Sequence, residues 1–155
     1  MLFRTAPATR DDVLDERALG RRTNGELDAL FRASPAGDIP RGRLWGTALL
    51  FPGTRLCAPL GRLTRLLLWQ GKTTEDPPAA LSNLVGPWGL RAVRALLSHD
   101  RSWVDGKACV LIDYSTTSTV ARMVRDEIRL VAPGLYLGVV WLWRRRVGWF
   151  TLRQQ

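Results

Sequence analysis

The stretch VRDEIRLVAPGLYLG, residues 124–138, carries two strand-like halves on either side of Pro133-Gly134. Side chains alternate between the two faces of a strand, so the first half divides into two sets. One set is apolar apart from a single carboxylate, and it comprises Val124, Asp126, Ile128 and Leu130. The other set is charged, and it comprises Arg125, Glu127 and Arg129. The pattern predicts a strand with one buried face and one solvated face, which turns back at Pro133-Gly134 into a second antiparallel strand.

Strand signals of the same kind recur through the second half of the chain and twice before it. A hairpin signal at Asp105-Gly106 joins two of these segments. Because closure protects the edges of a sheet, consecutive hairpins favour a mainly β (α+β) fold, either an antiparallel barrel or a strongly curved sheet. The predicted strands are residues 44–51, 66–72, 102–104, 107–115, 120–131, 135–143 and 147–153.

Helix signals are fewer. Thr23 is followed three residues later by Glu26, which matches a capping box and predicts a helix over about residues 24–32. Three- and four-residue spacings over 57–67 and 90–97 predict two short helices that cover an end or a face of the sheet. We interpret residues 1–22 as an N-terminal extension whose order the sequence leaves open, and residues 23–155 as a single β-barrel-like domain with an N-terminal helix.

The composition, 46% hydrophobic and 24% charged, is typical of a soluble globular protein. The longest apolar run, residues 130–143, is interrupted by Pro133-Gly134 and is too short to span a bilayer. The N-terminal residues MLFRTAPATRDD lack the apolar core of a signal peptide. We therefore expect a cytoplasmic protein, in which Cys57 and Cys109 stay reduced because they form no disulfide framework.

The formal net charge of +9 comes almost entirely from arginine, since lysine occurs only at positions 72 and 107. The arginines are spread along the chain, so the charge alone is weak evidence for a polyanion, and nucleic acid is not the expected partner. The segment WLWRRRVGWF, residues 141–150, combines tryptophans with arginines, as a peripheral membrane patch or a platform for single-stranded nucleic acid does. Strand alternation favours another interpretation, in which Trp141 and Trp143 are buried and the arginines occupy a solvated turn.

Motifs for nucleotide or metal chemistry do not occur in the sequence. There is neither a GxGxxG nor a GxxxxGK[ST] pattern. The single histidine, His99, lies in the charged segment SHDR, which is typical of a surface, and no GxSxG elbow accompanies it. One histidine and two distant cysteines do not supply a zinc site. We expect neither a metal nor an organic cofactor.

Polar side chains interrupt several of the apolar strand faces. Asp126 is one, and Asp113 stands at the end of another such face, with Tyr114 on the opposite face of the same strand. These groups either satisfy one another in a small core, with Lys72 pairing an aspartate, or converge on a small-molecule site. A buried carboxylate beside a lysine or a tyrosine would also have the shifted pKa that general acid–base chemistry needs.

The order of several short motifs resembles a known family. A GTA strand is followed by WQGK, an asparagine, a DGK hairpin, a DY strand and a DEIR strand that leads into PGLYLG. This order is similar to that of the lipocalin-like, calycin-type small β-barrels of bacteria, and most similar to the GXWXG-type proteins. The resemblance covers residues 41–155 and implies a hydrophobic-ligand barrel whose internal polar residues are Trp69, Lys72, Asp113, Asp126 and Arg129. By alternation Arg129 faces away from Asp126, so the implied arrangement needs a bulge between them.

The predicted function is binding of a small hydrophobic molecule, such as a lipid, an isoprenoid or a polyketide-like compound, inside the barrel. The alternative is a cofactor-free cyclase or isomerase that acts on a hydrophobic biosynthetic intermediate in the same cavity. In that case Asp126 or Asp113 would be the acid or base, and Lys72 or Tyr114 would stabilise negative charge. The sequence leaves the oligomeric state open. The expected ligand contacts are Trp69, Lys72, Asn83, Tyr114, Asp126, Arg129 and Tyr136.

Overall fold

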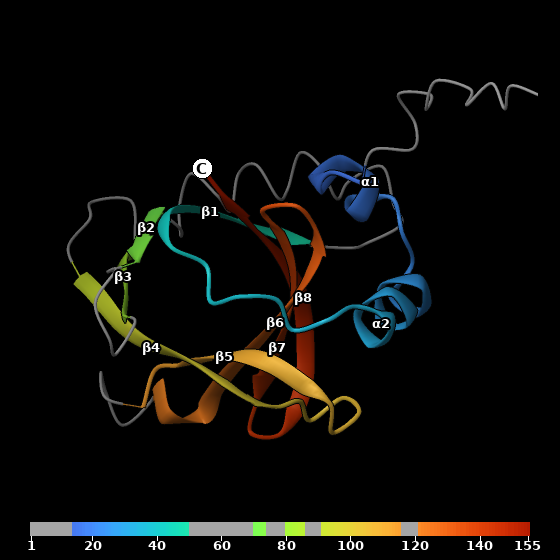
Figure 1. Cartoon of the computed structure of the whole chain (residues 1–155). Coiled ribbons are helices and arrows are strands. Elements are labelled where there is room, and N and C mark those ends of the chain that lie inside the picture. The colour runs from blue at the N-terminus through green and yellow to red at the C-terminus, as the bar shows by residue number, and fades with distance from the viewer. Residues whose placement is uncertain (1–13, 50–69, 74–79, 86–90, 116–120) are drawn as a thin grey trace, which may run out of the picture.

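The computed structural model describes residues 14–49, 70–73, 80–85, 91–115 and 121–155. These residues form two short helices, α1 (Glu16–Gly20) and α2 (Asn24–Ala33), ahead of a run of antiparallel strands (Figure 1). A 3-10 turn, Ala121–Met123, leads into the sixth strand. The strands are β1 (Gly42–Leu49), β2 (Gln70–Thr73), β3 (Ala80–Val85), β4 (Arg91–Arg101), β5 (Ala108–Asp113), β6 (Val124–Ala132), β7 (Leu135–Leu142) and β8 (Arg145–Gln154).

Antiparallel pairing joins each described strand to the next one along the chain. The last strand, β8, also pairs with β1, from Leu44 opposite Gln154 to Leu49 opposite Trp149, so that β1–β8 form a closed barrel. The pairing between β1 and β2 is shorter and runs only from Gly42 to Leu44 on the β1 side. The structure therefore confirms the predicted mainly β, antiparallel architecture with an N-terminal helix.

Both faces of β6 are buried, and each meets a different hydrophobic core. The inner face lines the barrel, whose buried residues are Leu44, Ala95, Leu97, Val110, Ile112, Tyr114, Ile128, Tyr136, Phe150 and Leu152. The second core lies outside the barrel under the two helices, and its buried residues are Leu19, Leu27, Phe31, Leu49, Leu135, Leu137, Val139 and Trp149. The prediction of a solvated charged face is therefore wrong. Glu127 and Arg129 are fully buried, because α2 and the β4–β5 loop cover that face.

Helix α2 begins as the sequence predicts. The hydroxyl of Thr23 accepts a hydrogen bond from the backbone N–H of Glu26, and the Glu26 carboxylate accepts one from the N–H of Thr23 at 2.7 Å, so the capping box is confirmed. Leu27 and Phe31, one turn apart, face the second core. The helix thus places an apolar stripe on the outer side of the barrel.

Helix α1 packs into the same outer core. The Asp15 carboxylate accepts a hydrogen bond from the N–H of Ala18 at 2.7 Å and caps the helix. Leu19 is fully buried among the residues of the second core. Residues 14–22 of the N-terminal extension therefore contact the barrel domain, whereas residues 1–13 lie outside the described residues.

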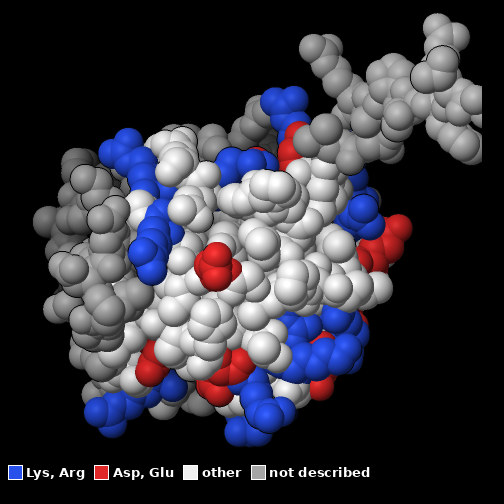
Figure 2. Space-filling view, viewed as in Figure 1, with Lys and Arg blue, Asp and Glu red and all other residues white. Residues whose placement is uncertain are grey.

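The segment between α2 and β1, residues 34–41, crosses one end of the barrel (Figure 1). Ile39 packs against the inner core. Much of this face is uncharged in Figure 2, with Lys and Arg side chains around its rim. His99 is exposed, as predicted, and lies beside this segment. Three backbone carbonyls of the segment accept hydrogen bonds: Pro35 from Leu130 N–H at 3.0 Å, Gly37 from His99 Nε2 at 2.9 Å, and Asp38 from the Tyr136 hydroxyl at 2.7 Å.

The predicted helix over 90–97 is wrong, because this segment belongs to β4 and pairs with β3 and β5. Ala95 and Leu97 alternate into the inner core, so a two-residue period fills the barrel and overrides the three- and four-residue spacing. The predicted helix over 57–67 lies outside the described residues.

The β4–β5 connection is longer than the predicted two-residue turn. A type I′ turn needs positive φ at both central residues, but of Asp105 and Gly106 only Gly106 has it, at +73°. Instead, the N–H of Ser102 donates to the carbonyl of Lys107 at 2.9 Å, and the N–H of Gly106 donates to the carbonyl of Ser102 at 2.8 Å. These bonds close a wider loop, residues 102–107, over the outer face of β6.

Gly138 of β7 leaves room for the ring of Phe150, its register partner on β8. A Cβ at position 138 would lie 2.2 Å from Cζ of that ring. Gly138→Ala is therefore expected to displace the ring and to lower the free energy of unfolding by about 1–3 kcal/mol in urea denaturation. The control is Gly148→Ala, where no described atom lies within 4 Å of the added Cβ, and it should not lower stability. Equal stability of the two variants would contradict the placement of the ring.

Candidate functional site

Asp126 lies on the inner face of β6, opposite Ile112 of β5 and Val140 of β7. The residue is only 3% exposed. Tyr114, which directly follows β5, donates a hydrogen bond from its hydroxyl to Asp126 Oδ2 at 2.9 Å. The other carboxyl oxygen, Oδ1, is also buried, but it has no hydrogen-bond partner among the residues that the structure describes. One half of the carboxyl group is thus satisfied, and the other half is buried without a partner among the described residues.

Burial raises the pKa of Asp126 to about 7. The hydrogen bond from Tyr114 acts against this rise, whereas the nearby charge of Glu127 adds to it. Burial, together with the neighbouring carboxylate, also raises the pKa of Tyr114 well above its usual value. The tyrosine therefore remains a hydrogen-bond donor, while Asp126 gains or loses its proton close to neutral pH. Such a carboxyl can donate a hydrogen bond in one state and accept one in the other.

Tyr114→Phe removes the hydroxyl that stabilises the ionised form of Asp126. We expect the pKa of Asp126 to rise further, because burial still disfavours the charge and its hydrogen bond is gone. The free energy of unfolding should fall by about 1 kcal/mol. A carboxyl ¹³C NMR titration of the variant measures the pKa directly. An unchanged or lower pKa would show that the two side chains do not interact.

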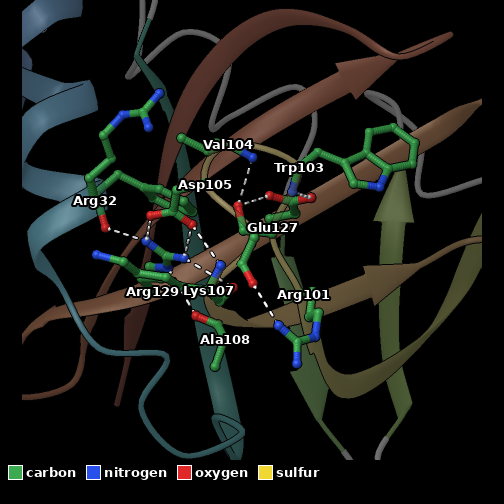
Figure 3. A network of polar contacts seen from close by, with 12 residues as sticks. Arg32, Arg101, Trp103, Val104, Asp105, Lys107, Ala108, Glu127 and Arg129 are labelled. Atoms are coloured by element: carbon green, nitrogen blue, oxygen red, sulfur yellow. Dashed lines mark hydrogen bonds and ion pairs between the residues drawn. The ribbon is translucent and has the colours of Figure 1, made fainter.

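The outer face of β6 carries Glu127, whose two carboxylate oxygens are both hydrogen-bonded. Oε2 accepts from the Ser102 hydroxyl at 2.6 Å, and Oε1 accepts from the N–H of Trp103 at 2.9 Å and from Nε of Arg125 at 2.7 Å. The Ser102 hydroxyl oxygen in turn accepts from the N–H of Val104 at 3.0 Å. Figure 3 shows these contacts holding the start of the β4–β5 loop. This carboxylate therefore fixes a loop and has no oxygen left over for a ligand.

Arg129 continues the same network (Figure 3). Its guanidinium forms a bidentate ion pair with Asp105, at 2.6 and 2.8 Å, and it lies 4.6 Å from the ring centre of Phe31. The family resemblance implies that Arg129 points into the barrel, and this is wrong for the present chain. The irregularity in the β6–β7 pairing falls beyond Leu130, so no bulge reverses the alternation between positions 126 and 129. The remaining guanidinium contacts are the backbone carbonyls of Phe31, Lys107 and Ala108.

Asp113 and Tyr136 occupy separate places. Asp113 is on the face of β5 opposite to Tyr114, and its carboxylate accepts from the N–H and hydroxyl of Ser115 at 2.8 and 3.0 Å. Asp113 therefore does not join Asp126, and the prediction that it acts in the same site is wrong. Tyr136 does line the inner core, but its hydroxyl donates to the carbonyl of Asp38 at the end of the barrel that residues 34–41 cross.

Lys72 and Asn83 are described only through their backbones. Lys72 lies in β2 opposite Ser82, and Asn83 lies in β3 opposite Gly71. Asn83 is thus part of a barrel strand. Trp69 lies outside the described residues. The structure consequently brings Tyr114 to Asp126, and it leaves the predicted roles of Lys72, Asn83 and Trp69 as predictions.

The buried network of Glu127, Ser102 and Arg129 could not be seen in the sequence. The charges on one face of the strand look solvated when the strand is read alone. The apolar stripe of α2, with Leu27 and Phe31, was the signal that a second layer must cover some face of the sheet. The missing information was which strand it covers.

In the described part of the chain, the acidic, histidine and cysteine side chains bear on metal binding, and the length and apolarity of the helices bear on membrane spanning. Within it, no group of three or more His, Cys, Asp and Glu side chains is placed to hold a metal ion. Cys109 is a free, buried thiol whose pKa is raised to about 12, chiefly by burial. No helix in the described ranges is both long enough and apolar enough to cross a membrane.

Comparison with known proteins places the fold but not the activity. No family model matches the chain, and no curated protein matches it. The structure is similar to the crystal structure of a protein from Thermomonospora curvata, with a TM-score of 0.57 and 14% sequence identity. The similarity covers 86% of this chain and 88% of the other. At this level of identity the two proteins share a fold, and the comparison assigns no ligand or reaction.

Proposed function

We propose that the barrel binds a small, mostly apolar molecule whose one polar group contacts Asp126. The observation that carries the proposal is Oδ1 of Asp126, a buried carboxyl oxygen without a partner among the described residues. A buried polar group without a hydrogen bond destabilises a fold by about 1–3 kcal/mol, so such groups are uncommon in interiors. A ligand that supplies the missing hydrogen bond would remove that penalty.

The outer face of the same strand supports this interpretation by contrast. There, both carboxylate oxygens of Glu127 have partners, and Arg129 is paired on several sides. On β6, the charged groups of the outer face thus have hydrogen-bond partners on all sides, whereas the carboxyl group of Asp126 on the inner face has a partner for only one of its two oxygens. Neutral groups such as Nε1 of Trp45 and Oγ1 of Thr151 also lack partners among the described residues, but an unpaired carboxylate destabilises a fold more than an unpaired neutral group does.

The surroundings of Asp126 suit a ligand with a carbonyl or hydroxyl group on an apolar body. Protonated Asp126 could donate to a carbonyl oxygen, and ionised Asp126 could accept from a hydroxyl. The apolar residues Ile112, Ile128 and Val140 lie around it on β5, β6 and β7. A lipid, an isoprenoid or a polyketide-like compound has this chemistry. Membership of the lipocalin-like, calycin-type barrels and a cytoplasmic location are further parts of the proposal.

The second candidate function is acid–base catalysis in the same site, as in a cofactor-free cyclase or isomerase. A pKa of about 7 for Asp126 favours it, because a group that titrates near neutral pH is suited to proton transfer. Asp126 would be the acid or base, and Tyr114 would stabilise negative charge. Asp126→Asn separates the two functions: an enzyme should lose its rate by about a hundredfold or more while it still binds, whereas a binder keeps much of its affinity.

The test uses native mass spectrometry of the purified protein, followed by organic extraction and mass analysis of any retained compound. The variant is Asp126→Leu, and the matched control is Asp113→Leu, which changes an aspartate on the outer face of the neighbouring strand. We expect wild type and control to retain a compound with a carbonyl or hydroxyl group, and the Asp126 variant to lose it.

If the protein carries no bound compound after purification, a second measurement tests the proposal. Binding of dodecanol is compared with binding of dodecane, and wild type should prefer the alcohol by about tenfold or more, the effect of one good hydrogen bond to a charged or buried group. Asp126→Leu should abolish this preference. Equal affinity for the two compounds in wild type, or an unchanged preference in the variant, would refute the proposed role of Asp126.

A further inference from the structure

The large apolar side chains that are exposed in the described structure gather around the turn between β7 and β8. Trp143 is 67% exposed and Val147 is 57% exposed, both beside the turn between β7 and β8. The 3-10 turn before β6 lies at the same end of the strands as this turn. The β4–β5 loop begins at the other end and folds back over the outer face of β6, so that Trp103 contacts Trp141 and Arg144. We call this region the tip surface, and its apolar members are Trp103, Met123, Leu142, Trp143 and Val147.

Direct contacts hold the tip surface together. The N–H of Trp143 donates to the carbonyl of Met123 at 3.1 Å. The Arg144 guanidinium lies 4.5 Å from the ring centre of Trp103, and the rings of Trp103 and Trp141 meet edge to face at 5.7 Å. Residues from three separate segments therefore form one continuous surface.

The turn at the centre of the tip surface has an unusual sequence. Leu142 pairs with Arg145, so Trp143 and Arg144 are the two loop residues of the β7–β8 hairpin. Both have positive φ, +48° and +64°. A two-residue turn with this backbone strongly favours Asn-Gly, and a bulky side chain at positive φ is an outlier that lowers stability. Trp143 and Arg144 therefore occupy positions that the fold alone would give to other residues.

The tip surface is also rich in positive charge. Arg146 pairs with Asp28, and Arg125 pairs with Asp100 and Glu127. No ion pair forms within the described part of the chain for Arg122, Arg144 or Arg145, all of which are exposed. The surface thus combines exposed apolar groups with unneutralised guanidinium groups.

We propose that the tip surface docks onto membranes that contain anionic lipids. Tryptophan and aliphatic side chains insert between lipid headgroups, and arginine binds the phosphate and carboxylate groups of those headgroups. Single-stranded nucleic acid fits less well. The ring of Trp103 is already contacted by the guanidinium groups of Arg125 and Arg144, each at 4.5 Å, and is not free to stack on bases. The aliphatic side chains of Leu142 and Val147 neither stack on nucleic-acid bases nor form hydrogen bonds with them. They can be buried at the boundary between lipid headgroups and acyl chains.

The decisive variant is the double substitution Trp143→Asn, Arg144→Gly. It installs the sequence that the turn prefers, so the fold should be as stable as wild type or more so, and a loss of binding cannot come from unfolding. Removing one arginine near an anionic surface weakens binding by about fivefold, and removing the exposed tryptophan weakens it further. We therefore expect at least about a tenfold loss. The control, Arg21→Gln, removes a charge beside α1, away from the tip surface in Figure 1.

Binding of the full chain is measured by vesicle flotation, with vesicles of phosphatidylcholine alone and of phosphatidylcholine mixed with phosphatidylserine. We expect wild type and Arg21→Gln to bind the mixed vesicles only, and added salt to weaken this binding. The double variant should remain unbound. Failure of wild type to bind the mixed vesicles, or binding of the double variant as tight as wild type, would overturn the proposal. Binding of a single-stranded oligonucleotide without vesicle binding would overturn it in favour of a nucleic-acid surface.

Discussion

Replacing Arg129 by methionine is expected to lower the free energy of unfolding by about 3–5 kcal/mol, because a buried ion pair loses one partner. The Asp105 carboxylate, whose pKa the hydrogen bond from Arg129 holds down at about 2, would be left without its main partner. The carbonyls of Phe31 and Ala108 would lose their donors as well. The arginine joins α2, the β4–β5 loop and β6, so its loss should loosen three parts of the outer layer together.

Urea denaturation at neutral pH measures this effect. The matched control is Arg153→Met, which breaks a more exposed pair with Glu16, and it should lower stability by less than about 1 kcal/mol. If the two variants lose the same amount, the buried network does not hold the loop and helix as described. A change in the urea dependence itself would instead indicate altered compactness of one state.

At alkaline pH, Asp126→Asn should change the free energy of unfolding by a similar amount but in the opposite direction, so that the variant is more stable than wild type. Burial raises the pKa of Asp126 from 3.8 to about 7 in the folded protein, so the fold binds this proton more tightly than the unfolded chain does. The contribution of this proton to the free energy of unfolding is therefore fully present below about pH 4 and is lost as the pH rises toward 7. Above about pH 7 the wild-type protein has lost roughly 4 kcal/mol of its free energy of unfolding, since a pKa shift of one unit corresponds to about 1.4 kcal/mol. Asparagine cannot ionise, and the variant avoids this loss.

The measurement is the difference in unfolding free energy between variant and wild type across the pH range, in which contributions from other titrating groups cancel. The difference should be near zero at about pH 4 and should grow with pH to a plateau above about pH 7. The control is Gly148→Ala, which changes no titratable group and should give a flat difference. A flat difference for Asp126→Asn would show that Asp126 ionises as easily in the folded protein as in the unfolded chain.

Such a gain on removing a carboxyl would carry information about function. A residue that destabilises the fold near neutral pH contributes nothing to stability there, and ligand binding is the role that we propose for it. Stability and function often oppose each other at such sites. The residue whose replacement by asparagine raises stability is thus also the residue that function needs. Asp126→Leu should lose the preference for a polar ligand group, and Asp126→Asn should lose the catalytic rate if the protein is an enzyme.

The sequence allowed the inner half of this site to be predicted. Alternation along residues 124–131 placed Asp126 among apolar neighbours, and alternation along the preceding strand placed Tyr114 with Val110 and Ile112, away from Asp113. Register then brings Ile112 opposite Asp126, which sets Tyr114 within reach. The pairing itself was not predicted, because the register between two strands depends on the connection between them.

The outer half could not be predicted in the same way. A strand reads as half solvated when its charges alternate with apolar residues, and only the position of α2 reveals that Glu127 and Arg129 are covered. The same lack of tertiary information explains β4, whose apolar spacing suits a helix until its neighbours β3 and β5 pair with it. Trp143 was predicted to be buried, but the hairpin turns one residue earlier than expected and leaves it exposed.

The most direct test of the account is a carboxyl ¹³C NMR titration that follows Asp126 in the intact protein, with the resonance assigned by its loss in Asp126→Asn. We predict a midpoint near pH 7, the value expected for a carboxyl buried in the barrel with only Tyr114 as a described partner. A midpoint near 4, the ordinary value of an aspartate, would contradict the account, because it would mean that the carboxyl is hydrated or fully paired and offers no unsatisfied oxygen to a ligand.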